Sequence, residues 1–411
     1  MAIRVLLLTQ WFEPEPTFKG LVFAKELMRQ GFEVEVLTGF PNYPGGRLYP
    51  GYKVKLLQRE VIHGVEITRV PLYPSHGQSA IGRVMNYLSF SAAASVYGLF
   101  GAKRPDVIYA YHPPLTVGIA AALIRIFRRI PVVYDVQDMW PDTLNATGMF
   151  SNRAGLKMVS RVCDWVYRTA DHLVVLSPGF KRILISRGVP ESKIDIIYNW
   201  CDENALAKVD GNISADFPGA ESFRILFAGN IGKAQALESV IKAAQILASR
   251  GANIIFVFLG GGLEVDNLKE LAARQQLYNV RFLPRVPMSE VGSYLNSADA
   301  LLVHLKKDEL FTVTIPSKTQ AYMAAGKPIL MAVDGDAADL IRQSGCGQVA
   351  ESENPHDIAN AALALQSLSA DEKESMAGKG PAYYKENLSL SVGTSHFGSI
   401  FRRLSFAKRK S

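Results

Sequence analysis

The residues best suited to bind an anion lie in one stretch, IPSKTQAYMAAGKPIL, from residue 315 to residue 330. A Pro-Ser pair opens this stretch and a Gly-Lys-Pro run closes it, which predicts a helix from Ser317 to Ala325 followed by a buried strand. Lys318 stands in the first turn, where free backbone N–H groups and the helix dipole attract a phosphate. The alternative is a surface helix that carries an incidental lysine.

Three turns in the second half carry residues suited to the same task. Each follows a short apolar run, so we expect all three at the carboxyl edge of one parallel sheet, beside the start of the Lys318 helix. Glycine allows close approach of a phosphate, although glycine in a single βα turn also has purely local causes. No GxxxxGK[ST] pattern and no strand–GxGxxG–helix fingerprint occurs, which argues against kinases and dehydrogenases. The candidate residues are Gly229, Asn230, Lys233 and Gln235 in the first turn, Gly260, Gly261 and Gly262 in the second, and Pro284, Arg285 and Val286 in the third.

Polar residues also follow two apolar runs of the first half. His112 comes after one run, and it could titrate, donate to an oxyanion or cap the next helix. Asp138, Trp140 and Asp142 come after the next run, where burying such side chains without a purpose is costly. Asp138 could bind sugar hydroxyls or accept a proton, and Trp140 could stack on a sugar. Structural hydrogen bonding is the alternative for the acids.

A loop after the first predicted strand is a further candidate. It contains Glu15, and Gly20 lies near the start of the next helix. Ligands of open α/β sheets bind beyond the carboxyl ends of strands, so this loop could form a wall of the site. An ordinary connecting loop is the alternative.

The elements that would position these residues alternate between strand and helix. Apolar runs and helical patterns alternate from residue 3 to 197 and again from 225 to 331, which predicts an α/β fold with a parallel sheet in each half. The stretch from Gly39 to Gly64 is expected to be loop, and the last helical region is expected to break before Tyr383. The predicted divisions are a first domain at 1–200, a linker at 201–222, a second domain at 223–382, and a final helix with a basic tail at 383–411.

Composition limits the compartment and the partners. Three cysteines lie far apart without metal-ligand spacing, which favours a reduced, cytosolic chain. The N-terminal apolar run is too short for a signal peptide and fits a buried strand. Residues 1–200 hold 23 Lys+Arg against 15 Asp+Glu, which suits an anionic surface of lipid or nucleic acid. No nucleic-acid motif occurs, so we expect a membrane surface and no nucleic acid.

Two segments bear on how the chain would meet that membrane. Residues 84–102 carry no charge, but Ser, Asn and Gly dilute their apolar character, which favours a buried or interfacial helix over a span. Residues 401–410 hold five basic residues among aromatics, and such a tail either lies on anionic lipid or is solvated. Arg125, Arg128 and Arg129 form a second basic cluster beside apolar residues.

The string from Ser317-Lys318 through Tyr322-Met323-Ala324-Ala325-Gly326-Lys327-Pro328 resembles the sugar-nucleotide-binding segment of retaining GT-B glycosyltransferases of the family 4 type. It is most similar to the branch that builds bacterial surface polysaccharides such as O-antigen, capsule and colanic acid. The resemblance implies two Rossmann-like domains that face each other across a cleft, with a C-terminal helix that crosses back to the first domain. It also implies a peripheral protein on the inner face of the bacterial plasma membrane.

The resemblance implies substrates and roles as well. The donor would be a UDP-sugar, for which an N-acetylamino sugar is one candidate, and the acceptor would be a polyprenyl-diphosphate-linked glycan. No cofactor or metal is expected, since no Asp-x-Asp pair lies beside the glycine-containing turns. Asp138 and His112 are the catalytic candidates, with Glu15, Gly20, Trp140 and Asp142 on the acceptor side. The base would lie near Pro284–Val286, and the donor phosphates and sugar would contact the remaining turn residues together with Ser317, Lys318 and Gln320.

The chain departs from the family pattern at several positions. Asn230 stands where many members have Arg, and Val313 and Ala321 stand where many have two glutamates. Asp308 or Glu309 could replace one of those carboxylates. Gln137 holds the place of a histidine in many relatives, and glutamine cannot move protons.

Two other functions remain open at this point. A nucleotide-sugar epimerase of the same architecture would need a set of carboxylates and histidines around the sugar, which the second half lacks. A non-catalytic subunit that binds nucleotide sugar or membrane as a scaffold would explain the residues at Val313 and Ala321.

Overall fold

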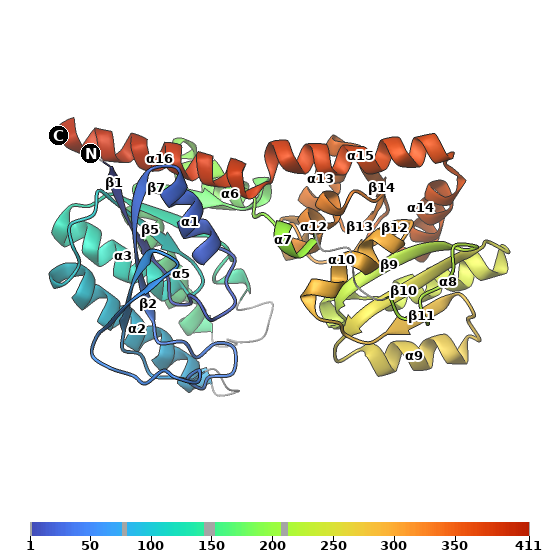
Figure 1. Cartoon of the computed structure of the whole chain (residues 1–411), viewed down its shortest axis with the longest axis horizontal. Coiled ribbons are helices and arrows are strands. Elements are labelled where there is room, and N and C mark those ends of the chain that lie inside the picture. The colour runs from blue at the N-terminus through green and yellow to red at the C-terminus, as the bar shows by residue number, and fades with distance from the viewer. Residues whose placement is uncertain (1, 76–79, 144–152, 207–212, 411) are drawn as a thin grey trace. The chain divides into compact units, whose positions relative to one another are not determined.

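The computed structural model describes residues 2–75, 80–143, 153–206 and 213–410. It divides into two compact units, one of Met1–Tyr198 with Leu390–Ser411 and one of Asn199–Ser389. The final helix therefore belongs to the first unit, as the predicted fold requires. Each unit contains one sheet flanked by helices (Figure 1), which confirms the predicted α/β class.

The first unit is built on an eight-stranded sheet in the order β3-β4-β2-β1-β5-β6-β7-β8. Neighbouring strands pair in parallel, except that β3 runs antiparallel to β4 at the edge. Because helices cover the sheet, its central strands are almost wholly apolar. The strands are β1 (Ile3–Leu8), β2 (Phe32–Gly39), β3 (Gln58–Ile62), β4 (Val65–Val70), β5 (Val107–Tyr111), β6 (Val132–Val136), β7 (His172–Val175) and β8 (Ile194–Ile196).

Two groups of helices pack in this unit. One pairs the first helix with the last, and the ring of Phe397 lies 5.4 Å from that of Phe23 and 5.2 Å from that of Tyr109. The other group comprises α2, α3 and α5, in which α3 contacts both α2 and α5. The helices are α1 (Leu21–Arg29), α2 (Ala80–Phe100), α3 (Leu115–Arg128), α5 (Arg153–Thr169), α6 (Pro178–Ser186) and α16 (Leu390–Lys410).

The second unit is built on a six-stranded parallel sheet in the order β11-β10-β9-β12-β13-β14. Its strands are β9 (Phe223–Asn230), β10 (Ile254–Gly261), β11 (Val280–Leu283), β12 (Ala300–His304), β13 (Ile329–Ala332) and β14 (Gly347–Val349). Its helices are α7 (Glu203–Leu206), α8 (Glu238–Ser249), α9 (Val265–Arg274), α10 (Met288–Ser297), α11 (Glu309–Thr312), α12 (Ser317–Ala325), α13 (Asp336–Ser344), α14 (Pro355–Ser367) and α15 (Ala370–Asn387).

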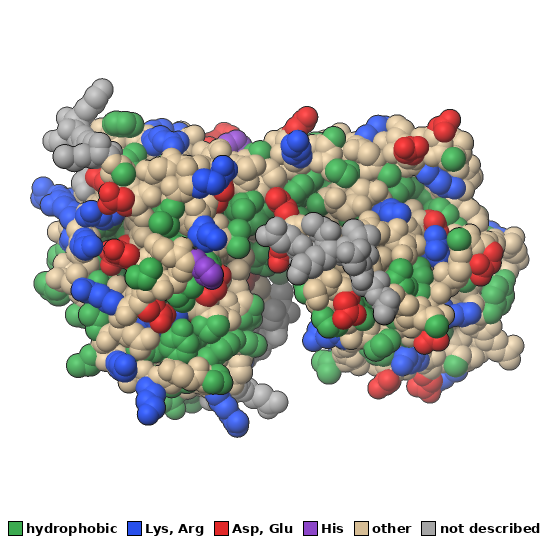
Figure 2. All heavy atoms as spheres, in the orientation of Figure 1, with side chains coloured by type: hydrophobic (Ala, Val, Ile, Leu, Met, Phe, Trp, Pro, Cys, Tyr) green, Lys and Arg blue, Asp and Glu red, His purple; other side chains and the backbone are tan. Residues whose placement is uncertain are grey.

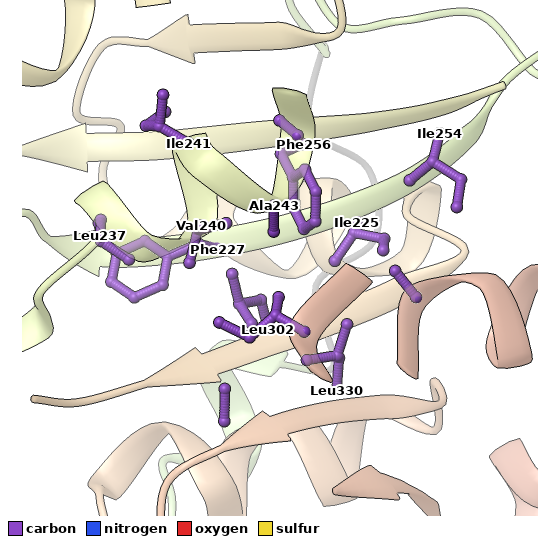
Figure 3. Packing of buried hydrophobic residues seen from close by; sticks show 14 of the residues in the cluster. Ile225, Phe227, Leu237, Val240, Ile241, Ala243, Ile254, Phe256, Leu302 and Leu330 are labelled. Carbon is purple, nitrogen blue, oxygen red and sulfur yellow. The ribbon is translucent and has the colours of Figure 1, made fainter. Parts of the chain in front are cut away.

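The core of the second unit joins the sheet to α8 and α14. Figure 3 shows Ile225 and Phe227 of β9 among side chains of α8, including Val240 and Ala243. All four side chains are fully buried. This packing fixes β9, whose carboxyl end carries the first of the three candidate turns.

The structure corrects several sequence predictions. The stretch from Gly39 to Gly64 contains β3. Neither α13 nor β14 was predicted, and β14 has only three residues. The predicted break before Tyr383 is wrong, since α15 runs through Pro381. A Cβ added at Gly380 would lie 2.8 Å from the carbonyl oxygen of Met323. This close packing of α15 on α12 overrides the helix-breaking tendency of proline.

The division between the units also differs from the predicted linker at 201–222. The second unit already begins at Asn199 and includes α7. Residues 207–212 of the predicted linker lie outside the described residues. The final helix begins at Leu390, several residues later than the predicted 383.

Candidate functional site

Lys318 lies in the first turn of α12, as predicted. The helix begins after Pro316, and no side chain caps it, so Ser317 is the first helical residue and not a cap. The Nζ atom of Lys318 lies 3.8 Å from the centroid of the Phe227 ring. Burial lowers the pKa of Lys318 to about 8. Among the residues that the structure describes, no carboxylate forms an ion pair with this side chain, so its charge remains for another partner.

Gly229 makes room for this lysine. It lies near the end of β9 with a φ of +137°, and a Cβ added there would lie 2.6 Å from Cε of Lys318. Tyr322 holds the helix to the same strand, because its hydroxyl accepts a hydrogen bond from the Ala228 N–H (2.9 Å) and donates to the Ala228 carbonyl oxygen (3.3 Å). Tyr322 belongs to the motif, but the sequence assigned it no role. A single tyrosine in a helix carries no sign of a partner 94 residues away.

The glycine run of the second turn has a structural role, and its predicted contact with the donor stays a prediction. Gly260 and Gly261 continue β10, and α9 begins only at Val265. A Cβ at Gly260 would clash with the carbonyl oxygen of Gly229, and one at Gly262 would clash with that of Ile231. These two glycines therefore let the backbones approach closely. Only Gly261 of the run has open space at its Cβ position.

The loop that follows β9 is held from β12. The Gly232 N–H donates to Oε1 of Gln235 (3.0 Å), and Nδ1 of His304 lies 2.6 Å from the Gln235 carbonyl oxygen. Burial lowers the pKa of His304 to about 4, so its ring is neutral and Nδ1–H donates. Lys233 and Asn230 are exposed on this loop. The sequence analysis missed His304 because it stands alone at a strand end.

The remaining donor-side candidates differ in accessibility. Pro284 and Arg285 are exposed after β11, the edge strand of the sheet. Gln320 is only 3% exposed, and with its amide oxygen and nitrogen exchanged the nitrogen would donate to the carbonyl oxygens of Pro316 (3.0 Å) and Ser317 (3.2 Å). In that orientation its side chain is used within α12, and its contact with the donor stays a prediction.

One Asp-x-Asp pair occurs, away from the three candidate turns. Asp334 follows β13, and its Oδ1 accepts a hydrogen bond from the Ser352 N–H (3.2 Å); Asp336 begins α13. Among the described residues, no group of three or more His, Cys, Asp and Glu side chains could hold a metal ion. Lys318 is one of several cations that the described residues place near the strand ends, together with the exposed Lys233 and Arg285.

Three predicted residues gather in the first unit. The His112 ring lies 5.7 Å from the Trp140 ring, and Nε1 of Trp140 donates to Asp138 at 3.4 Å. Burial lowers the pKa of His112 to about 3 and raises that of Asp138. His112 is therefore neutral, and its buried Nδ1 atom has no hydrogen-bond partner in the structure. Thr143 also donates to the Asp138 carboxylate.

A buried ion pair lies beside this cluster, and the sequence analysis missed it. Lys19 and Asp135 are both fully buried and form a charged hydrogen bond. Tyr109 donates to the same carboxylate at 2.6 Å, and Gln137 donates to its other oxygen. Nζ of Lys19 lies 4.9 Å from the ring centroid of Phe397 in α16. Gln137 thus supports Asp135, so its hydrogen bond is structural.

The other acceptor-side candidates serve the structure. The Glu15 carboxylate is 2% exposed and accepts hydrogen bonds from the backbone N–H groups of Phe12, Asn42 and Tyr43. Its burial raises its pKa to about 7. Gly20 is buried against the side chain of Glu13. Asp142 is exposed and pairs with Arg187. These contacts give Glu15, Gly20 and Asp142 structural roles, and their place on the acceptor side stays a prediction.

Comparisons with known proteins match both units. The family described as "Glycosyl transferase 4-like domain" matches residues 21–200, and the family described as "Glycosyl transferases group 1" matches residues 215–380. The chain is a family 4 glycosyltransferase. The two matches together span both candidate clusters and every strand of the two sheets except β1.

Individual relatives agree with this assignment. The glycosyltransferase is 26% identical over 309 residues to a glycosyltransferase named WbjE of Pseudomonas aeruginosa, covering 74% of this chain and 76% of that one. It is 28% identical over 311 residues to WcaI of Escherichia coli, which is named for colanic acid biosynthesis, covering 73% and 75%. Among solved structures, HepE of Anabaena in complex with UDP superposes with a TM-score of 0.67 at 16% identity, covering 98% and 100%. An E. coli protein titled for trehalose-6-phosphate reaches a TM-score of 0.71 at 11% identity, covering 97% and 98%. These structures confirm the GT-B fold.

The glycosyltransferase has no carboxylate at positions 313 and 321, where the family resemblance led us to expect glutamates. Val313 ends the short helix α11, and Ala321 is half-buried in α12. Asp308 caps α11 by accepting a hydrogen bond from the Leu310 N–H (3.0 Å) and pairs with Lys306 (3.1 Å). Glu309 is exposed. Asp308 is thus engaged in local structure, which leaves Glu309 as the less constrained carboxylate.

Proposed function

We propose that this glycosyltransferase moves a sugar from a UDP-linked donor to a hydroxyl of a polyprenyl-diphosphate-linked glycan in the synthesis of a bacterial surface polysaccharide. The observation that carries the proposal is Lys318, a cation without a carboxylate partner in the described structure, held beside Gly229 at the uncapped start of α12. Titles of similar structures that name UDP and UDP-glucose support the donor class. The name of WcaI supports the pathway.

The chemistry needs a site that stabilises a leaving diphosphate. When the bond between C1 of the sugar and the β-phosphate oxygen breaks, the electron pair stays on that oxygen. Lys318 and the first N–H groups of α12 would bind the resulting charge, an electrostatic contribution that is often the largest in catalysis. Each charge-assisted hydrogen bond contributes roughly 1.5–3 kcal/mol. Lys233 would add a second, more exposed cation.

Retention follows if the acceptor hydroxyl attacks from the face that the phosphate leaves. The departing phosphate oxygen then takes the hydroxyl proton, so the step needs neither an enzyme nucleophile nor a metal ion. This route suits a donor side that presents cations and backbone N–H groups. Pro284 and Arg285, exposed beyond β11, would contact the base.

The acceptor would bind at the cluster of Asp138, His112 and Trp140. Burial raises the pKa of Asp138, so its carboxyl group is suited to exchange a proton with a sugar hydroxyl. The neutral His112 ring can accept a hydrogen bond at Nδ1. Trp140 is half-buried and offers an apolar surface to a sugar.

The protein would act in the cytoplasm at the inner face of the plasma membrane. A lipid-linked acceptor is fixed in that membrane, and the excess of Lys and Arg in residues 1–200 suits its anionic surface. In the last helix, Arg402 and Arg403 are exposed and could add to this attraction.

Release of free UDP tests the proposal. The protein would be incubated with a panel of UDP-sugars, with and without a polyprenyl-diphosphate-linked glycan, and the anomeric configuration of the product would be read by NMR. We expect one donor to release UDP only with acceptor and to give a retained linkage. Tight UDP binding without turnover of any donor would support the scaffold alternative, which the residues at Val313 and Ala321 favour. UDP release with a free sugar epimer would support the epimerase.

A further inference from the structure

The outward side of α2 is apolar along the whole helix. Its exposed side chains recur three or four residues apart, so they share one face of the helix. The exposed fractions of three of them, Ile81, Val96 and Phe100, are 78%, 60% and 85%. We call the full set the outer face of α2, and it consists of Ile81, Val84, Met85, Leu88, Ala92, Val96 and Phe100.

The polar residues of α2 point inward instead. Asn86 is fully buried, and its Nδ2 donates to Oδ1 of Asn42 (3.1 Å) and to the Tyr73 carbonyl oxygen (2.7 Å). The Ser91 hydroxyl is also buried and donates to the Thr116 carbonyl oxygen at 2.7 Å. A helix on the surface of a water-soluble protein normally turns its apolar side inward and its polar side outward. In α2 the inner side also holds the fully buried Phe90 and Ala94, so the helix is apolar on both sides, and its apolar outer side indicates an apolar neighbour there.

The size of this face argues for a specific partner. A helix of 21 residues is about 31 Å long at 1.5 Å per residue. Single exposed apolar side chains are common, but a continuous apolar surface of this length marks a site of interaction. No helix among the described residues is long and apolar enough to cross a membrane. An apolar face on one side of such a helix is suited to lie along a membrane surface.

Basic residues predominate in the chain segment around α2, although Lys103 lies 3.6 Å from Glu66 and the Tyr97 hydroxyl of α2 donates to Glu35 (3.2 Å). From residue 71 to residue 105 the chain has no acidic residue, while Arg83, Lys103 and Arg104 are basic. The end of α3 lies beside the end of α2, because Nη1 of Arg128 donates to the Gly98 carbonyl oxygen at 2.6 Å. That end of α3 adds the exposed Arg129. Figure 2 shows Lys and Arg side chains along the flank of the first unit where Figure 1 places α2 and α3.

We propose that the outer face of α2 lies on a leaflet that contains anionic phospholipid. Its apolar side chains would enter the boundary between headgroups and acyl chains, and the exposed Arg104 and Arg129 would bind the headgroups at one end of the helix. A lipid surface fits better than a protein because it supplies both a long apolar layer and a uniform negative charge. This inference sharpens the membrane part of the proposed function, and it uses no residue of the donor side.

Sedimentation of the full chain with vesicles tests this inference. One set of vesicles would contain phosphatidylcholine alone and another would include phosphatidylglycerol. A variant carrying both Met85→Gln and Leu88→Gln should bind the anionic vesicles at least about tenfold more weakly than the unmodified chain, because two apolar side chains no longer enter the lipid. The matched control carries Met158→Gln and Ile185→Gln on α5 and α6, which are 64% and 38% exposed, and should bind as the unmodified chain does.

Two further variants separate the causes. Replacing Arg104 and Arg129 with Gln should weaken binding to the anionic vesicles alone, and added salt should reduce that difference. Lys318→Ala should keep full vesicle binding even if it loses UDP, so failure of the donor proposal leaves this test intact. Thermal unfolding would verify that each variant folds. Failure of the unmodified chain to bind, or an equal loss in both double variants, would overturn the inference. Self-association through α2 without lipid binding would overturn it in favour of a protein interface.

Discussion

Lys19 in the first unit and Lys318 in the second unit are both buried lysines, but only Lys19 has a carboxylate partner in the described structure. Burial lowers the pKa of both. For Lys19, the Asp135 carboxylate opposes that shift by its charge and its hydrogen bond. For Lys318, burial alone determines the shift, and the pKa falls to about 8. The charge of Lys19 is thus paired with a carboxylate, whereas the charge of Lys318 has no carboxylate partner among the described residues.

This difference separates a structural charge from a binding charge. A buried pair contributes little net stability, but breaking it leaves an uncompensated charge in a dry environment. A cation held beside a helix start without a carboxylate partner costs some stability, and an arriving anion can repay that cost as binding energy. We therefore predict that mutation of the Lys19–Asp135 pair affects folding, whereas mutation of Lys318 affects ligand binding.

The largest expected effect is that of Asp135→Ala. The variant removes the carboxylate that accepts from Lys19, Tyr109 and Gln137, so we expect the free energy of unfolding of the first unit to fall by about 3–5 kcal/mol. Denaturant unfolding followed by tryptophan fluorescence would measure this, because three of the four tryptophans, Trp11, Trp140 and Trp165, lie in that unit.

The control for this variant replaces the pair together. Lys19→Met with Asp135→Asn keeps the shape of both side chains and removes both charges, so it should recover part of the lost stability. Asp135→Ala should leave UDP affinity within about twofold while the protein remains folded, a change of under 0.5 kcal/mol. A large loss of UDP affinity with little loss of stability would contradict the structural role of the pair.

The next effect is that of Lys318→Met. The methionine keeps an apolar contact with Phe227 but removes the charge, so UDP affinity should fall about tenfold to a hundredfold, as loss of a 1.5–3 kcal/mol interaction implies. The free energy of unfolding should be unchanged or slightly higher. Calorimetric titration with UDP would measure the affinity. Lys242→Met on the exposed side of α8 is the matched control and should bind UDP as the unmodified chain does. Equal UDP affinities of the unmodified chain and both variants would contradict a role for Lys318 in the site.

The sequence predicted the fold more completely than it predicted the site. Local patterns located β1, β4 and α12 because each is bounded by turn residues and shows a clear hydrophobic period. They missed the course of α15 through Pro381, since its packing against α12 is a tertiary effect.

The site depends still more on contacts between distant residues. Lys318 was predicted because a helix start carries its own sequence signal. Lys19 was missed because its partner Asp135 lies 116 residues away, and no local pattern joins them. Glu15 was predicted on the acceptor side because its loop follows the first strand, but the sequence did not show that its carboxylate accepts hydrogen bonds from three backbone N–H groups. Which polar side chains are already satisfied by the fold is visible only in three dimensions.

The pKa of Lys318 is the most direct test of the account. Because its folded pKa of about 8 lies below the unfolded value of 10.5, the unfolded state binds more protons between these values, and stability rises with pH across that window. A bound diphosphate favours the charged lysine, so UDP affinity should fall as pH rises through about 8. An NMR titration of lysine labelled at Cε, with Lys318→Met to assign the signal, would measure the pKa directly. The account predicts a value near 8 that rises when UDP binds; a value near 10.4, or one that UDP leaves unchanged, would contradict it.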